Sequence, residues 1–261
     1  MIREIGQVVF NREIAKHFYE AEIIAPLISS KCKPGQFINI LPSSNWKNVM
    51  RRPMSVSFQD DVKIRIIYKI VGEGTQLIGN WKVGESVDLI GPLGNYWKGW
   101  EGYFPILMGG GVGIAPILNL HYYLNSQNIN HVLIMGARTK AEHFLQPSQN
   151  ENIFLTTDDG SIGVKGWITN ALNEFPFDPL KSKIFTCGPP LMMEAIRKLA
   201  LDKKIECDLA LERLMACGFG ICQGCTVEKT NNEKGTHSYR SKFALACIDG
   251  PIFSSSELVT C

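Results

Sequence analysis

Four of the eight cysteines lie near the end of the chain, at a spacing that can bind iron. Cys217, Cys222 and Cys225 form the pattern C-x4-C-x2-C, and Cys247 follows after a longer segment. This is the spacing of plant-type 2Fe–2S centres, in which four thiolates hold the cluster. The sequence therefore predicts that these four residues ligate one 2Fe–2S cluster.

The residues between these cysteines are rich in glycine. A cluster needs backbone N–H groups turned towards its sulfides, and Gly218, Gly220 and Gly224 permit the positive φ angles that this requires. Zinc is the alternative, although zinc sites favour paired C-x2–4-C sequences and only one such pair is present. Free cysteine behaves as a small hydrophobe, so the other cysteines are expected in the core or tail. They are Cys32, Cys187, Cys207 and Cys261.

Composition is that of a packed globular protein. The chain has 261 residues, of which 45% are hydrophobic and 20% charged, enough for two domains and a small appendage. A formal net charge of +2 offers no electrostatic attraction for nucleic acid or an anionic membrane. The N-terminus lacks the pattern of a secretory signal. A cysteine-rich chain in a reducing compartment points to metal or redox chemistry. We therefore expect a cytoplasmic protein that binds no nucleic acid.

One stretch without charged residues, between Glu101 and Arg138, is long enough to raise the question of a membrane span. A transmembrane helix needs about 20 predominantly apolar residues in one run. Glycines, prolines and polar residues interrupt this stretch after about half that length. It is better explained by a buried strand, a glycine turn and a helix, and we expect no membrane span.

Two patterns of predicted secondary structure divide the chain into two parts before its cysteine-rich tail. The first hundred residues alternate short apolar runs with turn residues, which predicts an antiparallel β-barrel. From Phe104, strand-like runs alternate with helical segments, which predicts a parallel sheet covered on both faces. The expected strands of the two parts are 7–10, 37–40, 55–58, 62–70 and 86–90, then 105–111, 131–137, 153–159 and 183–190. The expected helices of the second part are 115–127, 167–175 and 191–202.

Two motifs of the barrel region could bind a phosphate. The first is Arg52-Pro53-Met54-Ser55, where a guanidinium and a hydroxyl on one strand face could grip a phosphate together. The second is Gly72-Glu73-Gly74-Thr75, where backbone N–H groups and a hydroxyl precede a possible helix. Taken alone, the first could be a surface arginine beside an edge proline, and the second an ordinary tight turn.

Two further motifs lie in the α/β region. The run Gly109-Gly110-Gly111-Val112-Gly113 follows a strand and opens a helix, so a ligand could approach its backbone. The run Cys187-Gly188-Pro189 ends a later strand, at the carboxyl edge where open α/β sheets bind ligands. The glycine run is not the G-x-G-x-x-G fingerprint, and a purely structural turn is the alternative.

Taken together, these motifs resemble the ferredoxin–NADP reductase superfamily over residues 1 to about 205. The full chain looks like the electron-transfer subunits of the two-subunit, NAD-linked dihydroorotate dehydrogenases. The loop MACGFGICQGC, the run CIDGPIF from Cys247, and the segment Thr157–Thr169 carry that resemblance. It implies an FAD-binding barrel (1–101), an NAD-binding α/β domain (102–205) and a 2Fe–2S domain (206–261).

The resemblance also implies roles for individual residues. FAD would be held by Arg52, Pro53, Met54 and Ser55, by the strand end Ile67, Tyr68 and Lys69, and by Gly74 and Thr75 at its pyrophosphate. NAD would lie across Gly110, Gly111 and Gly113 and across Cys187, Gly188 and Pro189. Arg138 and Lys140 could receive the 2′-phosphate of NADP, so the preference for NAD follows from the resemblance alone.

The partner implied is an FMN-containing catalytic subunit that oxidises dihydroorotate, in a heterotetramer with two copies of each chain. Electrons would run through the cluster and FAD to NAD. We find no nucleophile–base set of the triad kind, and the five histidines are scattered, so no catalytic side chain is predicted. A related alternative is the small subunit of an NADH-dependent ferredoxin–NADP oxidoreductase or a sulfide dehydrogenase. Those proteins tend to carry aspartate where this chain has Cys217. A protein that uses the cluster only as a structural clip is a further alternative, and the flavin motifs oppose it.

Overall fold

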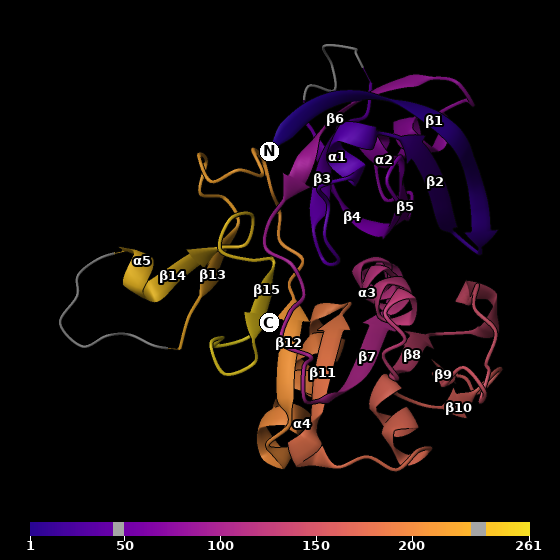
Figure 1. Ribbon diagram of the computed structural model, residues 1–261, viewed down its shortest axis with the longest axis vertical. Coiled ribbons are helices and arrows are strands. Elements are labelled where there is room, and N and C mark those ends of the chain that lie inside the picture. Colours follow the sequence, from indigo (N-terminus) through magenta and orange to yellow (C-terminus); the bar gives the residue numbers. More distant parts are fainter. Residues whose placement is uncertain (44–49, 231–238) are drawn as a thin grey trace.

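The computed structural model describes residues 1–43, 50–230 and 239–261. It shows a barrel above a sheet, with a smaller tail at one side (Figure 1). The barrel and the mostly parallel sheet confirm the fold class predicted from the sequence. Within the described residues, no helix is long and apolar enough to cross a membrane.

The N-terminal part is a closed antiparallel barrel with the strand order β1-β2-β5-β4-β3-β6. Inward-facing side chains such as Ile40, Ile64 and Ile66 are fully buried and form its core. The strands and helices of this part are β1 (Ile2–Ala15), β2 (Phe18–Ile24), α1 (Pro26–Ser29), β3 (Phe37–Leu41), β4 (Arg52–Gln59), β5 (Lys63–Tyr68), α2 (Glu73–Gly79) and β6 (Ser86–Leu93).

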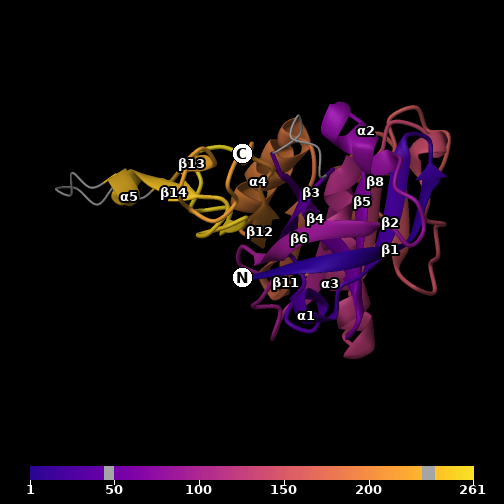
Figure 2. The same ribbon diagram turned by 90° about the horizontal axis from the view of Figure 1, so that it is seen from above.

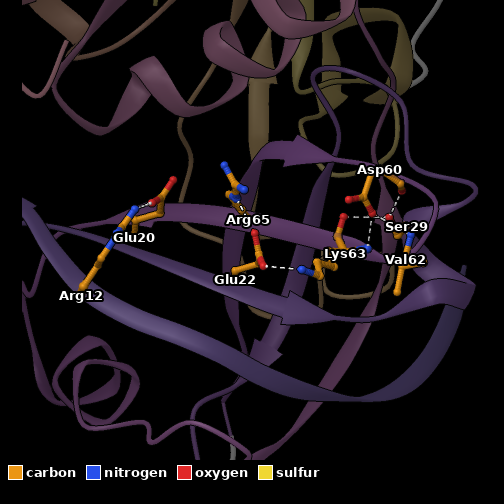
Figure 3. Close-up of polar contacts among 8 residues, drawn as sticks. All are labelled: Arg12, Glu20, Glu22, Ser29, Asp60, Val62, Lys63 and Arg65. Carbon is orange, nitrogen blue, oxygen red and sulfur yellow. Dashed lines mark hydrogen bonds and ion pairs between the residues drawn. The ribbon is translucent and has the colours of Figure 1, made fainter.

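Strand β2 was not indicated by the sequence pattern, because glutamates interrupt its apolar residues. The structure gives Glu22 two cationic partners, both on the same face of the neighbouring strand β5 (Figure 3). Lys63 Nζ lies 3.0 Å from its carboxylate, and Arg65 Nε lies 2.6 Å from it. The buried glutamate is therefore part of an ion-pair network on the barrel wall.

The second part is a seven-stranded sheet of order β10-β9-β8-β7-β11-β12-β15, parallel except for β15. On β7, Ile106 and Met108 face a core that includes Met193 of α4. Leu107 faces the opposite core, with Leu118 of α3. The elements are β7 (Phe104–Gly110), α3 (Ile114–Ser126), β8 (Val132–Ala137), β9 (Ile153–Thr157), β10 (Val164–Lys165), β11 (Ser182–Cys187), α4 (Pro190–Lys203), β12 (Glu206–Ala210) and β15 (Ile252–Ser254).

The helix expected over 167–175 is wrong in type. The structure has a 3-10 helix, Ile168–Asn173, in its place. The segment holds β-branched residues and asparagines, which disfavour a regular α-helix. The described part of the chain also has 3-10 helices at Gly111–Gly113, Lys140–Glu142 and Pro179–Lys181.

Part of the tail adds two strands to one edge of the sheet, and the rest of the tail projects away from it. Strand β12 pairs with β11, and β15 returns from near the C-terminus to pair with β12. The parallel sheet thus extends beyond residue 205, where the sequence placed the start of the tail domain. Between them, β13 (Thr226–Glu228), α5 (Tyr239–Lys242) and β14 (Phe243–Leu245) point away from the body (Figures 1 and 2).

Helix α3 joins the two main parts, because it lies between the barrel and the sheet (Figure 1). Its buried Asn119 donates a hydrogen bond from Nδ2 to the carbonyl oxygen of Val56 on β4, at 3.0 Å. Tyr122 meets Phe58 of β4 edge-on. Strand β4, which carries the Arg52–Ser55 motif, is therefore held against helix α3, which follows the glycine turn.

Candidate cofactor sites

The four predicted cluster ligands are brought together in the tail. Cys225 and Cys247 are 2% and 1% exposed, whereas Cys217 is half-buried and Cys222 is exposed. Cys225 and Cys247 lie beside the paired strands β13 and β14, and a backbone bond joins Ala246 N–H to the Cys225 carbonyl at 2.9 Å. The site thus has a buried side and a side open to solvent.

The thiols meet in two pairs: Cys217 with Cys222, and Cys225 with Cys247. Among the described residues, no three Cys, His, Asp or Glu side chains converge as the ligands of one metal ion do. A single tetrahedral zinc ion needs its sulfurs at about 2.3 Å, whereas a 2Fe–2S cluster shares four thiolates between two irons. Two thiol pairs fit two irons better than one zinc ion.

The loop surrounds its first sulfur with N–H donors. The Cys222 N–H points at Cys217 Sγ, 3.4 Å away, and the Gly224 N–H points at Cys222 Sγ, 3.5 Å away. Burial raises the pKa of Cys217, but N–H groups of Cys222 and Phe219 outweigh it, and the pKa falls to about 6. The backbone is thus arranged to stabilise thiolate, the form that binds metal.

Cys247, on the buried side, behaves differently. Burial and a hydrogen bond shared with Cys225 raise the pKa of its thiol to about 12. The expected glycine conformations hold at Gly218 (φ +79°) and Gly220 (φ +87°). The expectation for Gly224 is wrong, because the positive φ is at Gln223 (+55°) instead.

The cluster loop rests on the barrel through Asn39 of β3, which the sequence reading missed. Asn39 is 1% exposed, and its Nδ2 donates to the carbonyl oxygen of Cys217 at 2.9 Å. A Cβ on Gly218 would lie 2.2 Å from the same nitrogen, so only glycine permits this approach. No local signal marks Asn39, because its partner is 178 residues away.

A second clamp holds the fourth ligand's loop. Asn95, after β6, donates from Nδ2 to the carbonyls of Asp249 and Ile252 at 3.0 and 2.8 Å, and its Oδ1 accepts from the Ile252 N–H at 3.0 Å. The segment after Cys247 is thereby tied to the barrel. Asn39 of β3 thus holds the loop of Cys217, and Asn95, just after β6, holds the segment that follows Cys247.

The predicted flavin motif begins β4, where its residues are half-buried. The Arg52 guanidinium lies directly on Gly74, because a Cβ at that glycine would be 2.4 Å from Arg52 Nε. The structure thus brings the R-P-x-S and G-x-G-T motifs together. Thr75 is buried, and its hydroxyl accepts hydrogen bonds from the Val71 and Gly72 N–H groups at 2.9 and 3.2 Å. That hydroxyl therefore caps its own turn.

Arg52 and Ser55 cannot share one phosphate in the way expected above. They are three residues apart on a strand whose pairing with β3 is regular, from Arg52 opposite Ile40 to Ser55 opposite Phe37. Successive residues of a strand face opposite sides, so residues three apart do so too. The idea that both lie on one strand face is wrong, and they can touch only different parts of a ligand. Between them, Pro53 pairs with Asn39, and Met54 packs on the barrel core.

The other predicted flavin residues end β5. Ile67 and Tyr68 are 5% and 2% exposed, so their side chains belong to the protein interior. Burial raises the pKa of Tyr68 to about 12, although its hydroxyl donates to Asn11 Oδ1 at 2.7 Å. The ammonium of Lys69 lies 4.1 Å from the centre of the Phe18 ring. Ile67 and Tyr68 can thus offer a ligand mainly their backbone.

The two nucleotide motifs lie side by side at the carboxyl edge of the sheet. Strands β7 and β11 are neighbours, with Gly109 opposite Cys187. A Cβ on Gly113 would lie 2.4 Å from the Gly188 nitrogen, so the two turns are in backbone contact. A Cβ on Gly110 would strike Met192, just beyond Pro189, at 2.4 Å. Gly111 has a φ of +57° and more open space. This edge is where an open α/β sheet binds its ligand.

The histidines are less scattered than their sequence positions indicate. His121 Nδ1 lies 2.8 Å from His131 Nε2, and Asn125 Nδ2 lies 3.1 Å from His121 Nε2. They line a polar cavity of about 480 Å³ with Asn130 and Asn152. It lies at the amino ends of β8 and β9, opposite the glycine turns, and His237 lies outside the described residues.

The sequence of this chain is similar to those of known proteins. A sequence profile of the iron-sulfur cluster binding domain of dihydroorotate dehydrogenase B matches residues 212–259. The electron transfer subunit of dihydroorotate dehydrogenase B (NAD(+)) from Bacillus pumilus is 33% identical over 260 residues, covering 96% of each chain. The corresponding subunit from Fusobacterium nucleatum is 32% identical over 265 residues, covering 95% of each.

Solved structures show the same arrangement. The structure of an NADH-dependent reduced ferredoxin-NADP oxidoreductase is similar, with a TM-score of 0.81 and 28% identity. The alignment covers 97% of this chain and 89% of that one. A ferredoxin reductase of carbazole 1,9a-dioxygenase shares the fold, with a TM-score of 0.66 and 20% identity over 78% of this chain and 66% of that one.

Proposed function

Since this chain belongs to the family of electron transfer subunits of dihydroorotate dehydrogenase B (NAD(+)), we propose that it passes electrons from a dihydroorotate-oxidising subunit to NAD(+). It is an oxidoreductase subunit, and it works with a partner that holds the substrate site. Its cofactors are FAD and a 2Fe–2S cluster. A cluster that needs four reduced thiols fits a reducing compartment, and we place the protein in the cytoplasm.

The observation that carries this proposal is a contact of strand β3. This strand touches both the loop from Cys217 to Cys225 and the strand β4, which holds the proposed flavin motif. Asn39 of β3 donates to the Cys217 carbonyl, and in the sheet it pairs with Pro53 of the flavin motif. One residue thus touches the cluster loop with its side chain and the flavin strand with its backbone. A protein that moves electrons between two cofactors needs them at close range, and this contact supports such an arrangement.

The residues of the barrel hold the flavin in this proposal. Arg52, lying on Gly74, offers its guanidinium to the pyrophosphate, and the backbone N–H groups around Gly74 and Thr75 add donors. Pro53, Met54 and Ser55 line the remainder of the strand, and the backbone of Ile67 and Tyr68, with Lys69, completes the site. We infer FAD rather than FMN, because the Arg52–Gly74 contact forms a place for a pyrophosphate.

The nicotinamide nucleotide lies at the sheet edge in this proposal. Gly110, Gly111 and Gly113 let it approach the start of α3, where the helix dipole favours phosphate. Cys187, Gly188 and Pro189 form the adjoining wall. When bound, the flavin and cluster supply the exchange between a two-electron hydride and single electrons. The protein's own contribution is to hold and orient them.

The partner is the FMN-containing catalytic subunit, in a heterotetramer of two copies of each chain. We place its docking surface around the exposed ligand Cys222. Ile221 is 76% exposed and Leu214 is 92% exposed, and the side chain of Ile248 covers Gly220. Phe219 is half-buried against the sheet core, and Ile252 is buried, so these two are packing residues. Exposed apolar residues around a redox centre fit an electron-transfer partner.

A second candidate function has one observation in its favour. The solved structure of an NADH-dependent reduced ferredoxin-NADP oxidoreductase covers nearly the whole chain. In that case the partner would be a ferredoxin-linked subunit. We favour the dihydroorotate system, because the first ligand position is Cys217 and the relatives with that name match the chain at 32–33% identity.

The test is an assay of the purified chain with and without a candidate catalytic subunit. The chain alone should oxidise NADH with ferricyanide and should not oxidise dihydroorotate. Together, the two subunits should co-purify and reduce NAD(+) when dihydroorotate is added. Turnover of dihydroorotate by the lone chain would overturn the proposal. Binding without electron transfer, but with ferredoxin-dependent reduction, would support the second candidate.

A further inference from the structure

At the carboxyl end of β8, one arginine beside the nucleotide edge is held by a carboxylate. Strand β8 pairs with β7, with Gly136 opposite Gly110, so Arg138 lies level with the glycine turn at the next strand. In dinucleotide-binding sheets this region meets the ribose of the adenosine half, where an arginine can accommodate a 2′-phosphate. What Arg138 binds therefore bears on the choice between NAD and NADP.

Arg138 is bound by Glu142, four residues along the chain. Arg138 Nε and Nη2 both donate to Glu142 Oε1, at 3.0 and 2.5 Å. The two partners differ in exposure: the Arg138 side chain is 73% exposed and the Glu142 side chain 10%. A ligand could therefore reach the guanidinium from solvent, but the carboxylate that holds it is shielded.

Glu142 is fixed in place by its surroundings. The 3-10 helix Lys140–Glu142 lies against the barrel, where the Lys16 N–H donates to the Ala141 carbonyl at 2.9 Å. On the other side, the Lys140 N–H donates to Ser161 Oγ at 2.8 Å. The carboxylate is thus part of the domain junction and does not swing freely with the loop.

A second carboxylate, Asp158, acts on the same guanidinium through its charge. Asp158 follows β9, its N–H donates to the Ala137 carbonyl at 3.2 Å, and its charge acts on Arg138. Arg138 is therefore bound by one carboxylate and also lies in the field of a second one. A 2′-phosphate carries about two negative charges at neutral pH, and it would meet both.

We propose that Glu142 is a specificity-determining residue that makes this protein select NAD over NADP by occupying Arg138. This rests on the proposed function, since it concerns the same nucleotide edge. For Arg138 to bind a 2′-phosphate, the shielded Glu142 carboxylate would have to give up its partner. That carboxylate would then keep only the charge of Lys69 nearby. Separating a shielded charge from the partner that hydrogen-bonds to it is costly, and NAD asks for no such exchange.

The experiment compares nucleotides in the full chain with its cofactors. In Glu142→Gln, the ratio of kcat/KM for NADPH to that for NADH, with ferricyanide as acceptor, should rise about tenfold or more, the value of one charge-assisted hydrogen bond. Asp158→Asn, a surface change, should raise the same ratio by a smaller factor. The double variant Arg138→Gln/Glu142→Gln should fall back towards the wild-type ratio.

A binding measurement gives a readout besides turnover. The probe is 2′,5′-ADP, which carries the 2′-phosphate, compared with 5′-ADP as a competitor of NADH. Glu142→Gln should bind 2′,5′-ADP about tenfold more tightly relative to 5′-ADP. Glu194→Gln is the matched control, because Glu194 holds Arg197 at 2.9 Å on α4 in the same way but away from this edge. Its ratios should equal those of wild type.

The outcomes separate this inference from the function on which it rests. If wild type oxidises NADH and Glu142→Gln changes neither ratio, the role of Glu142 is overturned while the function stands, whatever Asp158→Asn does. A rise that persists in the double variant would also overturn it, because Arg138 would not be the phosphate ligand. If wild type oxidises neither nucleotide, it is the proposed function that fails.

Discussion

Asn39 on the barrel strand β3 donates a hydrogen bond to the backbone carbonyl of Cys217, the first of the proposed cluster ligands, across 178 residues of sequence. The Asn39 side chain is 1% exposed, and its Oδ1 is buried with no protein partner described. Because Gly218 lies against the same amide, the cluster loop can adopt its position only on this residue. The contact ties the segment that begins at Cys217 to the barrel strand β3.

Replacement of Asn39 should therefore loosen the cluster. Asn39→Leu removes a buried hydrogen bond and should lower the free energy of unfolding by about 1–3 kcal/mol. It should also speed the loss of iron to a chelator, measured by the bleaching of the cluster's visible absorption. Asn119→Leu is the matched control, because Asn119 is 2% exposed and donates to the Val56 carbonyl at 3.0 Å. It should cost similar stability but leave the rate of iron loss unchanged. Equal rates in the two variants would show that Asn39 has no specific role at the cluster.

Each cluster cysteine should be required for a normal cluster. Serine variants of Cys217, Cys222, Cys225 and Cys247 should contain less iron and acid-labile sulfide than wild type, or show an altered visible spectrum, because each removes a thiolate ligand. Cys207→Ser is the control, since Cys207 is buried in β12, within the sheet core. A full and unaltered cluster in the Cys247 variant would refute the fourth ligand and direct attention to Cys207 or Cys261.

The flavin should depend on Arg52 and on the space above Gly74. Arg52→Ala should weaken FAD binding about tenfold or more through loss of a charge-assisted hydrogen bond. Gly74→Ala should weaken it too, because the new Cβ would lie 2.4 Å from Arg52 Nε. Equilibrium titration of the apoprotein, and chromatography of the released cofactor, provide the measurements.

The neighbouring arginine serves as the control. Arg51 is bound to Asp88, with Nη2 2.8 Å from Oδ1, so Arg51→Ala should affect stability and leave FAD affinity unchanged. Recovery of FMN alone from the wild-type protein would contradict the assignment of the Gly74–Thr75 turn.

The ion pairs of Glu22 should make the barrel sensitive to acid. Burial opposes ionisation of this carboxyl, but hydrogen bonds and charges from Arg65 and Lys63 outweigh it and hold its pKa below 4.5. A carboxyl whose pKa is lowered by folding stabilises the folded state above its unfolded pKa, and that contribution is lost as the pH falls through the folded pKa.

Glu22→Gln should therefore lower the free energy of unfolding at pH 7 by about 1 kcal/mol, since both cations are partly exposed. The difference from wild type should shrink as the pH falls below 4.5. Glu20→Gln is the control, because Glu20 pairs at 3.3 Å with Arg12, whose side chain is 65% exposed (Figure 3). Chemical denaturation across this pH range measures both, and a difference that does not change with pH would refute the role of charge.

Much of the candidate site could be predicted from short sequence patterns. The spacing from Cys217 to Cys225 encloses one short loop, so nearby backbone geometry alone brings its thiols and N–H groups together. The same holds for the glycine turn after β7, which joins a strand to the helix that follows. In each case the interacting groups are neighbours along the chain, and residue type limits the conformations they can adopt. The positive φ at Gln223 in place of Gly224 shows that such limits leave a choice of residue.

Contacts between distant segments were decided only by the tertiary structure. Strands β12 and β15 are short, and their place in the sheet depends on partners supplied by β11 and by each other. Arg138 and Glu142 are only four positions apart in sequence, yet only the strand register sets their ion pair beside the glycine turn. Asn39 has no feature that distinguishes it from other asparagines until the tail folds back onto β3. Residue types and spacing determine which chemistry is available locally, but the packing of distant strands determines which groups meet.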